Sequence, residues 1–130
     1  MKHSYYGIKF VWDKWRGDQE RAKRITFNSK NPIYYEYFIP EESQMLIYVL
    51  GDVQQLQGMC VVTGPYSNSG NPRFNIKVPI DLVCDKSSGL TIPEIKKHLR
   101  MFNPHKEGIS YLPIKKSIFD LLYKDLQNKT

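Results

Sequence analysis

An alternation of apolar and polar side chains over residues 74–84 constrains the fold more than any other feature of the sequence. The apolar positions are Phe74, Ile76, Val78, Ile80 and Leu82, and the polar positions between them are Asn75, Lys77, Pro79 and Asp81. Because successive side chains of a strand point to opposite faces, this pattern predicts a strand with one buried and one wet face. Pro79 lies on the polar face, which favours an edge strand or a bulge.

Other strands are predicted from runs of aromatic, β-branched and apolar residues. They cover residues 5–12, 33–39, 45–50, 59–62 and 109–112. The runs 45–50 and 59–62 are wholly apolar, which is typical of strands buried on both faces. Gly51 and Asp52 open the turn of a hairpin between them, and polar loops are expected at residues 28–32 and 66–72.

Helices are predicted in three places. Asp18 caps a short basic helix over residues 19–24, and Thr91 with Glu94 forms a capping box before a second helix. Pro113 opens the last helix. The apolar stripe of the second helix is Ile95, Leu99 and Phe102, and that of the last is Ile114, Ile118, Leu121, Leu122 and Leu126.

Five to six mostly antiparallel strands with short peripheral helices indicate an α+β fold, a small closed or half-closed β-barrel. The 130 residues fit one domain, residues 1–130. The longest wholly apolar run has six residues, far below the roughly 20 that span a bilayer. Cys60 and Cys84 show no CxxC spacing, and the three histidines (His3, His98 and His105) have no ligand partners nearby. We therefore expect a soluble, cytoplasmic protein without metal or cofactor.

The charge is unevenly distributed along the chain. The net charge is +6, with +5 over residues 1–30, −4 over residues 31–65 and +5 over residues 66–130. A polarised basic surface of this kind attracts phosphate backbones. A solvated lysine-rich surface, reflecting composition bias alone, explains the same numbers equally well.

The segment MLIYVLGDVQQLQGMCVVTGPY, residues 45–66, resembles the EVE domain of the PUA-like superfamily, which also contains YTH and ASCH domains. The matching positions are Leu46–Val49, Gly51, Gly58, Val62, Thr63, Pro65 and Tyr66. The strand over residues 74–83 and the segment 108–122 also resemble their counterparts in that family. The resemblance covers residues 45–126 well and the first 44 poorly, where tyrosines stand in place of the family's usual tryptophan.

The resemblance implies a PUA-like barrel that holds a modified or extruded base in an aromatic pocket beside a basic surface, in DNA or RNA. It also implies a partner nuclease or motor protein, because such domains occur in host-defence systems. The candidate base-binding residues are Trp12, Trp15, Tyr34, Tyr35, Tyr66 and Asn68. The candidate phosphate-binding residues are Arg16, Arg21, Lys23, Arg24 and Arg73.

Two other functions stay open at this point. An ASCH-like amidohydrolase acting on a modified nucleoside needs a Lys/Thr/Glu set, for which the chain offers Lys9, Thr26, Thr63 and Glu36. General acid–base catalysis requires such groups within about 3 Å of each other or of the substrate, a distance that spacing alone does not fix. The other function is an interaction domain that binds an acidic partner through the basic ends of the chain.

Overall fold

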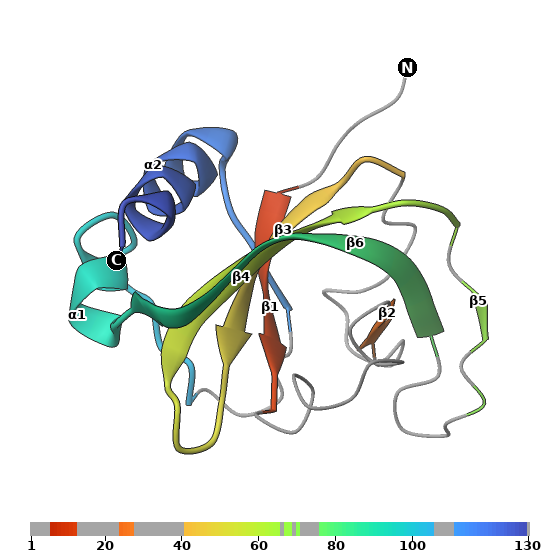
Figure 1. The fold of residues 1–130 in the computed structure, drawn as a ribbon, viewed down its shortest axis with the longest axis horizontal. Coiled ribbons are helices and arrows are strands. Elements are labelled where there is room, and N and C mark those ends of the chain that lie inside the picture. Colours follow the sequence, from red (N-terminus) through yellow and green to blue (C-terminus); the bar gives the residue numbers. More distant parts are fainter. Residues whose placement is uncertain are drawn as a thin grey trace.

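The computed structural model describes residues 6–12, 24–27, 41–65, 67–68, 70, 76–105 and 111–129, with the backbone alone for residues 24–27, 68 and 76. Its described strands form one seven-stranded sheet (Figure 1). They are β1 (Tyr6–Val11), β2 (Arg24–Phe27), β3 (Gln44–Val49), β4 (Gln55–Val62), β5 (Ser67–Asn68), β6 (Ile76–Leu90) and β7 (Tyr111–Pro113).

The sheet is mixed, with one parallel pair. Its order is β2-β6-β4-β3-β1-β7, and β5 also pairs with β6. Strands β1 and β3 run parallel, and every other pairing between the described strands is antiparallel. Within the described residues this order is an open path that ends at β2 and β7. The α+β class is therefore confirmed, and closure into a barrel stays a prediction.

Strand β6 confirms the predicted alternation but is longer than predicted, because it continues to Leu90. Val78 and Ile80 are buried, whereas Asp81 is exposed. The expectation that Pro79 marks an edge strand or a bulge is wrong. β6 lies between β4 and β2, and Pro79 pairs with Arg24, the first residue of β2. The missing N–H of the proline therefore falls at the end of that ladder, where its loss disturbs little.

The second half of β6 bulges against β4. Leu56 pairs with Leu90, but Gly58 pairs with Asp85, so β6 contains extra residues between these two points. Two glutamines of β4 hold this bulge in place. The Nε2 of Gln57 donates to the Ser87 carbonyl at 3.1 Å, and the N–H of Gly89 donates to Oε1 of Gln55 at 3.0 Å.

Two helices cover one face of the sheet: α1 (Ile92–Lys96) and α2 (Lys116–Gln127) (Figure 1). The predicted capping box of α1 is confirmed, since Oε1 of Glu94 accepts from both the N–H and the hydroxyl of Thr91 at 3.0 Å. Pro113 does not open α2, because it ends β7 and the helix begins at Lys116. Leu121 is 45% exposed rather than part of the buried stripe.

The helix predicted over residues 19–24 is wrong at its end. Arg24 is extended and begins β2, where a ladder to β6 replaces the helical hydrogen bonds. The rest of that helix lies outside the described residues. So do the loop over residues 28–32 and the strand over residues 33–39.

The core has two layers, one on each face of the sheet. The layer beneath the helices combines β1, β3 and β4 with side chains from α1, α2 and the turns after α1. Its aromatic centre is Phe10, Tyr48 and Phe102, whose ring centroids lie 5.3–6.0 Å apart. The opposite layer contains Val11, Met45, Ile47, Val49, Cys60, Val62, Val78, Ile80 and Tyr111. We call this opposite side, on which the described residues form no helix, the helix-free face.

Candidate functional site

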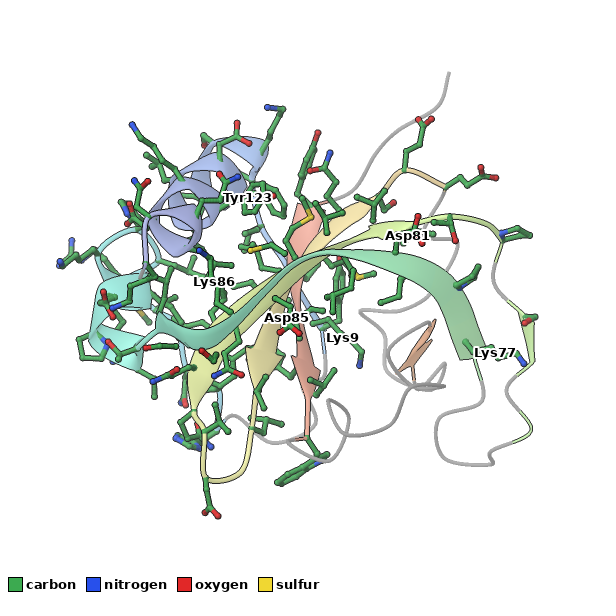
Figure 2. The ribbon with its side chains drawn as sticks, viewed as in Figure 1. Lys9, Lys77, Asp81, Asp85, Lys86 and Tyr123 are labelled. Atoms are coloured by element: carbon green, nitrogen blue, oxygen red, sulfur yellow. The ribbon has the colours of Figure 1, made fainter. Side chains whose placement is uncertain are left out.

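Lys9 of β1 is a charged side chain that the strand pattern places within the apolar layer of the helix-free face. Ile8 and Phe10 pack beneath the helices, and Val11 packs on the helix-free face. Because side chains alternate along a strand, Lys9 shares the face of Val11. It is only 4% exposed. Figure 2 shows its side chain pointing away from the helices, to the side on which β2 lies.

Neighbouring strands surround Lys9 with apolar and weakly polar groups. Its backbone lies opposite Ile47 of β3 on one side and Tyr111 of β7 on the other. The Cys60 thiol of β4 is close enough to act on its charge. Burial lowers the pKa of Lys9 to about 7, and Cys60 opposes this shift in part. The same burial raises the pKa of the Cys60 thiol far above its ordinary range. Lys9 is thus the group of this pair that changes charge near neutral pH.

The ring of Tyr111 packs over Gly7 on this face. A Cβ at residue 7 would collide with the ring and hydroxyl of Tyr111. A glycine two residues before Lys9 therefore lets β7 approach β1 closely and keeps an aromatic ring beside the lysine. Burial thus gives Lys9 a strongly lowered pKa, and perturbed pKa values of this kind are more frequent at functional sites than elsewhere.

Two short strands, β2 and β5, pair with β6 near its N-terminal end. Arg24 of β2 pairs with Pro79, and Asn68 of β5 pairs with Ile76. Their neighbours on β6, Val78 and Ile80, belong to the apolar layer of the helix-free face. The backbone thus brings two of the predicted nucleic-acid-binding residues to the end of the strand that lines this face.

Of the predicted base-binding residues, Trp12 is the one whose side chain the structure describes. It follows the last residue of β1 and is 64% exposed. The backbones of Arg24 and Asn68 are placed in β2 and β5. The remaining candidates lie outside the described residues: Trp15, Tyr34, Tyr35, Tyr66, Arg16, Arg21, Lys23 and Arg73. The base-binding and phosphate-binding assignments therefore stay predictions.

The set considered for an amidohydrolase is split among different strands. Lys9 is buried in β1, Thr26 lies in β2, and Thr63 is exposed after β4, where its N–H donates to the Pro79 carbonyl. Glu36 lies outside the described residues. Within the described part of the chain, no group of three His, Cys, Asp or Glu side chains is arranged to hold a metal ion. In the same part, no helix is long and apolar enough to cross a membrane.

Comparison with known proteins defines a fold class. No protein-family model matches the chain, and no curated protein matches it by sequence. Solved structures match it over nearly its whole length, and they include YTH domains, an ASCH protein and THYN1. The chain therefore shares its fold with YTH domains, an ASCH protein and THYN1, which confirms the predicted resemblance as a likeness of fold.

Three of these structures illustrate the similarity. Human THYN1 in complex with DNA containing 5-methylcytosine has a TM-score of 0.67 and 10% identity, over 98% of this chain and 99% of its own. The YTH domain of Zygosaccharomyces rouxii MRB1 in complex with N6-methyladenosine RNA has a TM-score of 0.66 and 9% identity, over 100% of this chain and 94% of its own. A mutant of the ASCH protein from Zymomonas mobilis has a TM-score of 0.60 and 9% identity, over 95% of this chain and 98% of its own.

The sequence offers Lys9 for an amidohydrolase set but does not predict that its side chain is buried. The sequence does carry a signal, because Lys9 interrupts the aromatic and β-branched run of residues 5–12. A lysine at this place is compatible with a strand that has one wet face. The position of β1 between β3 and β7 is a long-range feature that the local pattern does not show.

Proposed function

We propose that this chain is a nucleic-acid-binding module that recognises a modified base, such as a methylated one, on its helix-free face. The observation that supports this most is the fold. Nearly the whole chain matches two structures that hold methylated nucleic acid, one an RNA and the other a DNA. The two ligands differ in sugar and in base, and what these structures share with this chain is the fold.

The physical costs and gains of such binding are balanced. Flipping a base out of a stack costs a few kcal/mol. Stacking on an aromatic side chain returns about 1–3 kcal/mol per base, and burying one methyl group adds about 0.8 kcal/mol. Contacts to phosphates supply the rest and weaken with salt. The net charge of +6 and the exposed indole of Trp12 suit these two kinds of contact.

In this proposal the base lies in an aromatic pocket, to which Trp12 contributes at the end of β1. The predicted aromatic residues Trp15, Tyr34, Tyr35 and Tyr66 complete that pocket, and Asn68 reads a base edge. The predicted arginines and Lys23 hold the phosphate backbone. Closure of the sheet into a barrel would bring these segments together around the helix-free face. A separate nuclease or motor protein would act on the bound nucleic acid.

The test is binding to matched oligonucleotides, measured by fluorescence anisotropy at one fixed salt concentration. The set contains single- and double-stranded DNA and RNA, each unmodified or carrying 5-methylcytosine, 5-hydroxymethylcytosine or N6-methyladenine. The proposal expects a preference of about tenfold or more for one modification, which equals about 1.4 kcal/mol. Equal binding of all members would reject it and leave a generic basic surface.

Substitutions then locate the pocket. Trp12→Ala, Tyr34→Ala and Tyr35→Ala are expected to reduce the preference for the modified base. Met101→Ala is the control, since Met101 is 91% exposed and lies between α1 and β7, on the helix side. An unchanged preference in all three aromatic variants would place the pocket elsewhere.

One observation favours a second function, the ASCH-like hydrolysis of a modified nucleoside. A lysine with a pKa near 7 can act as a general base or acid at neutral pH. This alternative expects the protein to convert an acylated cytidine in the absence of nucleic acid, and expects Lys9→Met to abolish that turnover. No turnover by the wild-type protein would leave the binding module as the function.

A further inference from the structure

We propose that the outer side of α1 and α2 is a docking surface for an acidic segment of another protein that also carries apolar side chains. We call it the helix surface, and its exposed members are Lys96, Lys97, Arg100, Met101, Leu121 and Lys124. It lies on the side of the sheet opposite to the helix-free face (Figure 1). Its role is therefore separate from the proposed function and does not depend on it.

Charge is segregated between the strands and the helices of the described residues. The exposed acidic side chains in and beside the strands are Glu41, Glu42, Asp52, Asp81 and Asp85. The exposed basic side chains in the described part of the chain lie in or near the helices, at Lys96, Lys97, Arg100, Lys115, Lys116 and Lys124. A lysine-rich composition alone would place exposed lysines among the strands as well. The segregation therefore favours a basic surface with a partner of opposite charge.

The acidic residues of the two helices are already paired with basic side chains. The pairs are Glu94 with Lys129 at 3.0 Å, Asp120 with Lys116 at 2.8 Å and Asp125 with His98 at 2.8 Å. Within the described residues, the basic members of the helix surface make no such ion pair. Their charge is therefore available to the carboxylates of a partner.

The ion pair between His98 and Asp125 joins the turn after α1 to α2. His98 lies two residues beyond the end of α1, and Asp125 lies four residues after Leu121 in α2. Side chains four residues apart are neighbours on a helix, so Leu121 lies on the side of α2 that carries Asp125. The two segments thus contribute to one surface.

Two apolar side chains are exposed among these charges. Met101 is 91% exposed and Leu121 is 45% exposed. Met101 lies beside Arg100 in a turn, which the N–H of Phe102 closes by donating to the Leu99 carbonyl at 3.0 Å. The buried ring of Phe102 anchors this turn in the core, so its backbone presents Met101 and Arg100 from a fixed position. Methionine and arginine are both enriched in protein–protein interfaces.

The apolar members favour a protein over a nucleic acid as the partner. Bases bind to proteins by stacking on aromatic rings, whereas the apolar members of the helix surface are aliphatic. Met101 and Leu121 can instead pack against apolar side chains of a protein segment, while its carboxylates meet Lys124 and Arg100. An amphipathic helix that combines leucines with flanking glutamates presents both kinds of group.

The experiment measures the affinity for a labelled amphipathic helical peptide with leucines on one face and glutamates beside them, by fluorescence anisotropy at one fixed salt concentration. The reference probes are the same peptide with serine in place of each leucine, and an unmodified single-stranded DNA of equal charge. The leucine peptide is expected to bind about tenfold or more tightly than the serine peptide, because it buries apolar area on Met101 and Leu121.

Substitutions locate the binding on the helix surface. Lys124→Glu and Arg100→Glu are each expected to weaken binding of the leucine peptide by about fivefold or more, and Met101→Ser by about threefold. Lys77→Glu is the matched control, since it reverses an equal charge at the end of β6 far from the helices (Figure 2). It should leave the affinity for the peptide nearly unchanged. Because the substituted side chains of the helix surface are exposed, the melting temperatures should stay close to that of the wild-type protein.

Several results would overturn the proposal. Absence of peptide binding, equal binding of the leucine and serine peptides, or equal losses in Lys124→Glu and Lys77→Glu would leave only a generic attraction between opposite charges. Binding of the DNA that is lost in Lys124→Glu, with the leucine peptide bound more weakly than the DNA, would make the helix surface a nucleic-acid contact instead. These outcomes do not involve the preference for a modified base, so they leave the proposed function to its own test.

Discussion

The aromatic ring of Tyr111 covers the backbone of Gly7, so β7 packs against β1 without room for a methyl group between them. Gly7→Ala should therefore lower the unfolding free energy by about 1–3 kcal/mol, the usual cost of overpacking. Chemical denaturation monitored by circular dichroism measures this change.

A double-mutant cycle tests the cause of that loss. With Tyr111→Leu in place, Gly7→Ala should cost much less, because the aromatic ring is gone. Equal costs of Gly7→Ala in both backgrounds would show that the contact with Tyr111 is not what requires the glycine.

Gly89 in the bulge of β6 is expected to be the least replaceable of the described glycines. A Cβ there would collide with the backbone carbonyl of Leu56, which cannot move without breaking the β4–β6 ladder. Gly89→Ala should thus lower the melting temperature more than Gly64→Ala, whose Cβ would meet only the ring of Pro79 at 3.2 Å. Similar melting temperatures for the two variants would contradict this account of the bulge.

Glu94 links α1 to the end of α2, and its contribution should depend on pH. The Thr91 N–H and then the ammonium of Lys129, 3.0 Å away, lower its pKa to about 2. A depressed carboxyl pKa stabilises the folded state above about pH 4.5, and this stability is lost as the pH falls towards 2. Since Glu94 is partly exposed and solvent screens its charge, we expect its contribution to the unfolding free energy to be about 1 kcal/mol. Glu94→Gln should remove this pH dependence, and an unchanged acid profile would argue against it.

Burial of Lys9 should make stability rise with pH on the alkaline side. Between pH 7 and 10.5 the unfolded chain binds a proton at this lysine that the folded protein does not bind, so the slope is positive. The unfolding free energy of the wild-type protein should rise relative to that of Lys9→Met by up to about 1.4 kcal/mol per pH unit. Parallel stability profiles of the two proteins from pH 7.5 to 9 would mean that Lys9 is solvated and keeps its ordinary pKa.

The elements with a regular pattern could be predicted from the sequence, and those shaped by contacts between distant segments could not. The alternation in β6, the apolar runs of β3 and β4 and the capping box of α1 each carry a local signal that the structure confirms. Arg24 looked helical because its local sequence is basic and polar. It is extended because it pairs with Pro79, a residue far along the chain.

The candidate site shows the same division. The sequence predicted the class of fold and the strand that ends just before Trp12, whereas a role of Trp12 in a pocket stays a prediction. It did not reveal that Lys9 is buried, because burial depends on β3 and β7 lying on both sides of β1. The parallel pairing of β1 with β3 leaves no trace in the local pattern of either strand.

The most direct test of the account is an amide chemical-shift titration of the ¹⁵N-labelled protein with the best modified oligonucleotide and with its unmodified counterpart. The account predicts that the modified ligand shifts the amides of β1 around Lys9 and of Tyr111 at much lower concentration, whereas those of α2 stay in place. Shifts of equal size for both ligands, or shifts confined to α1 and α2, would contradict recognition of a modified base on the helix-free face.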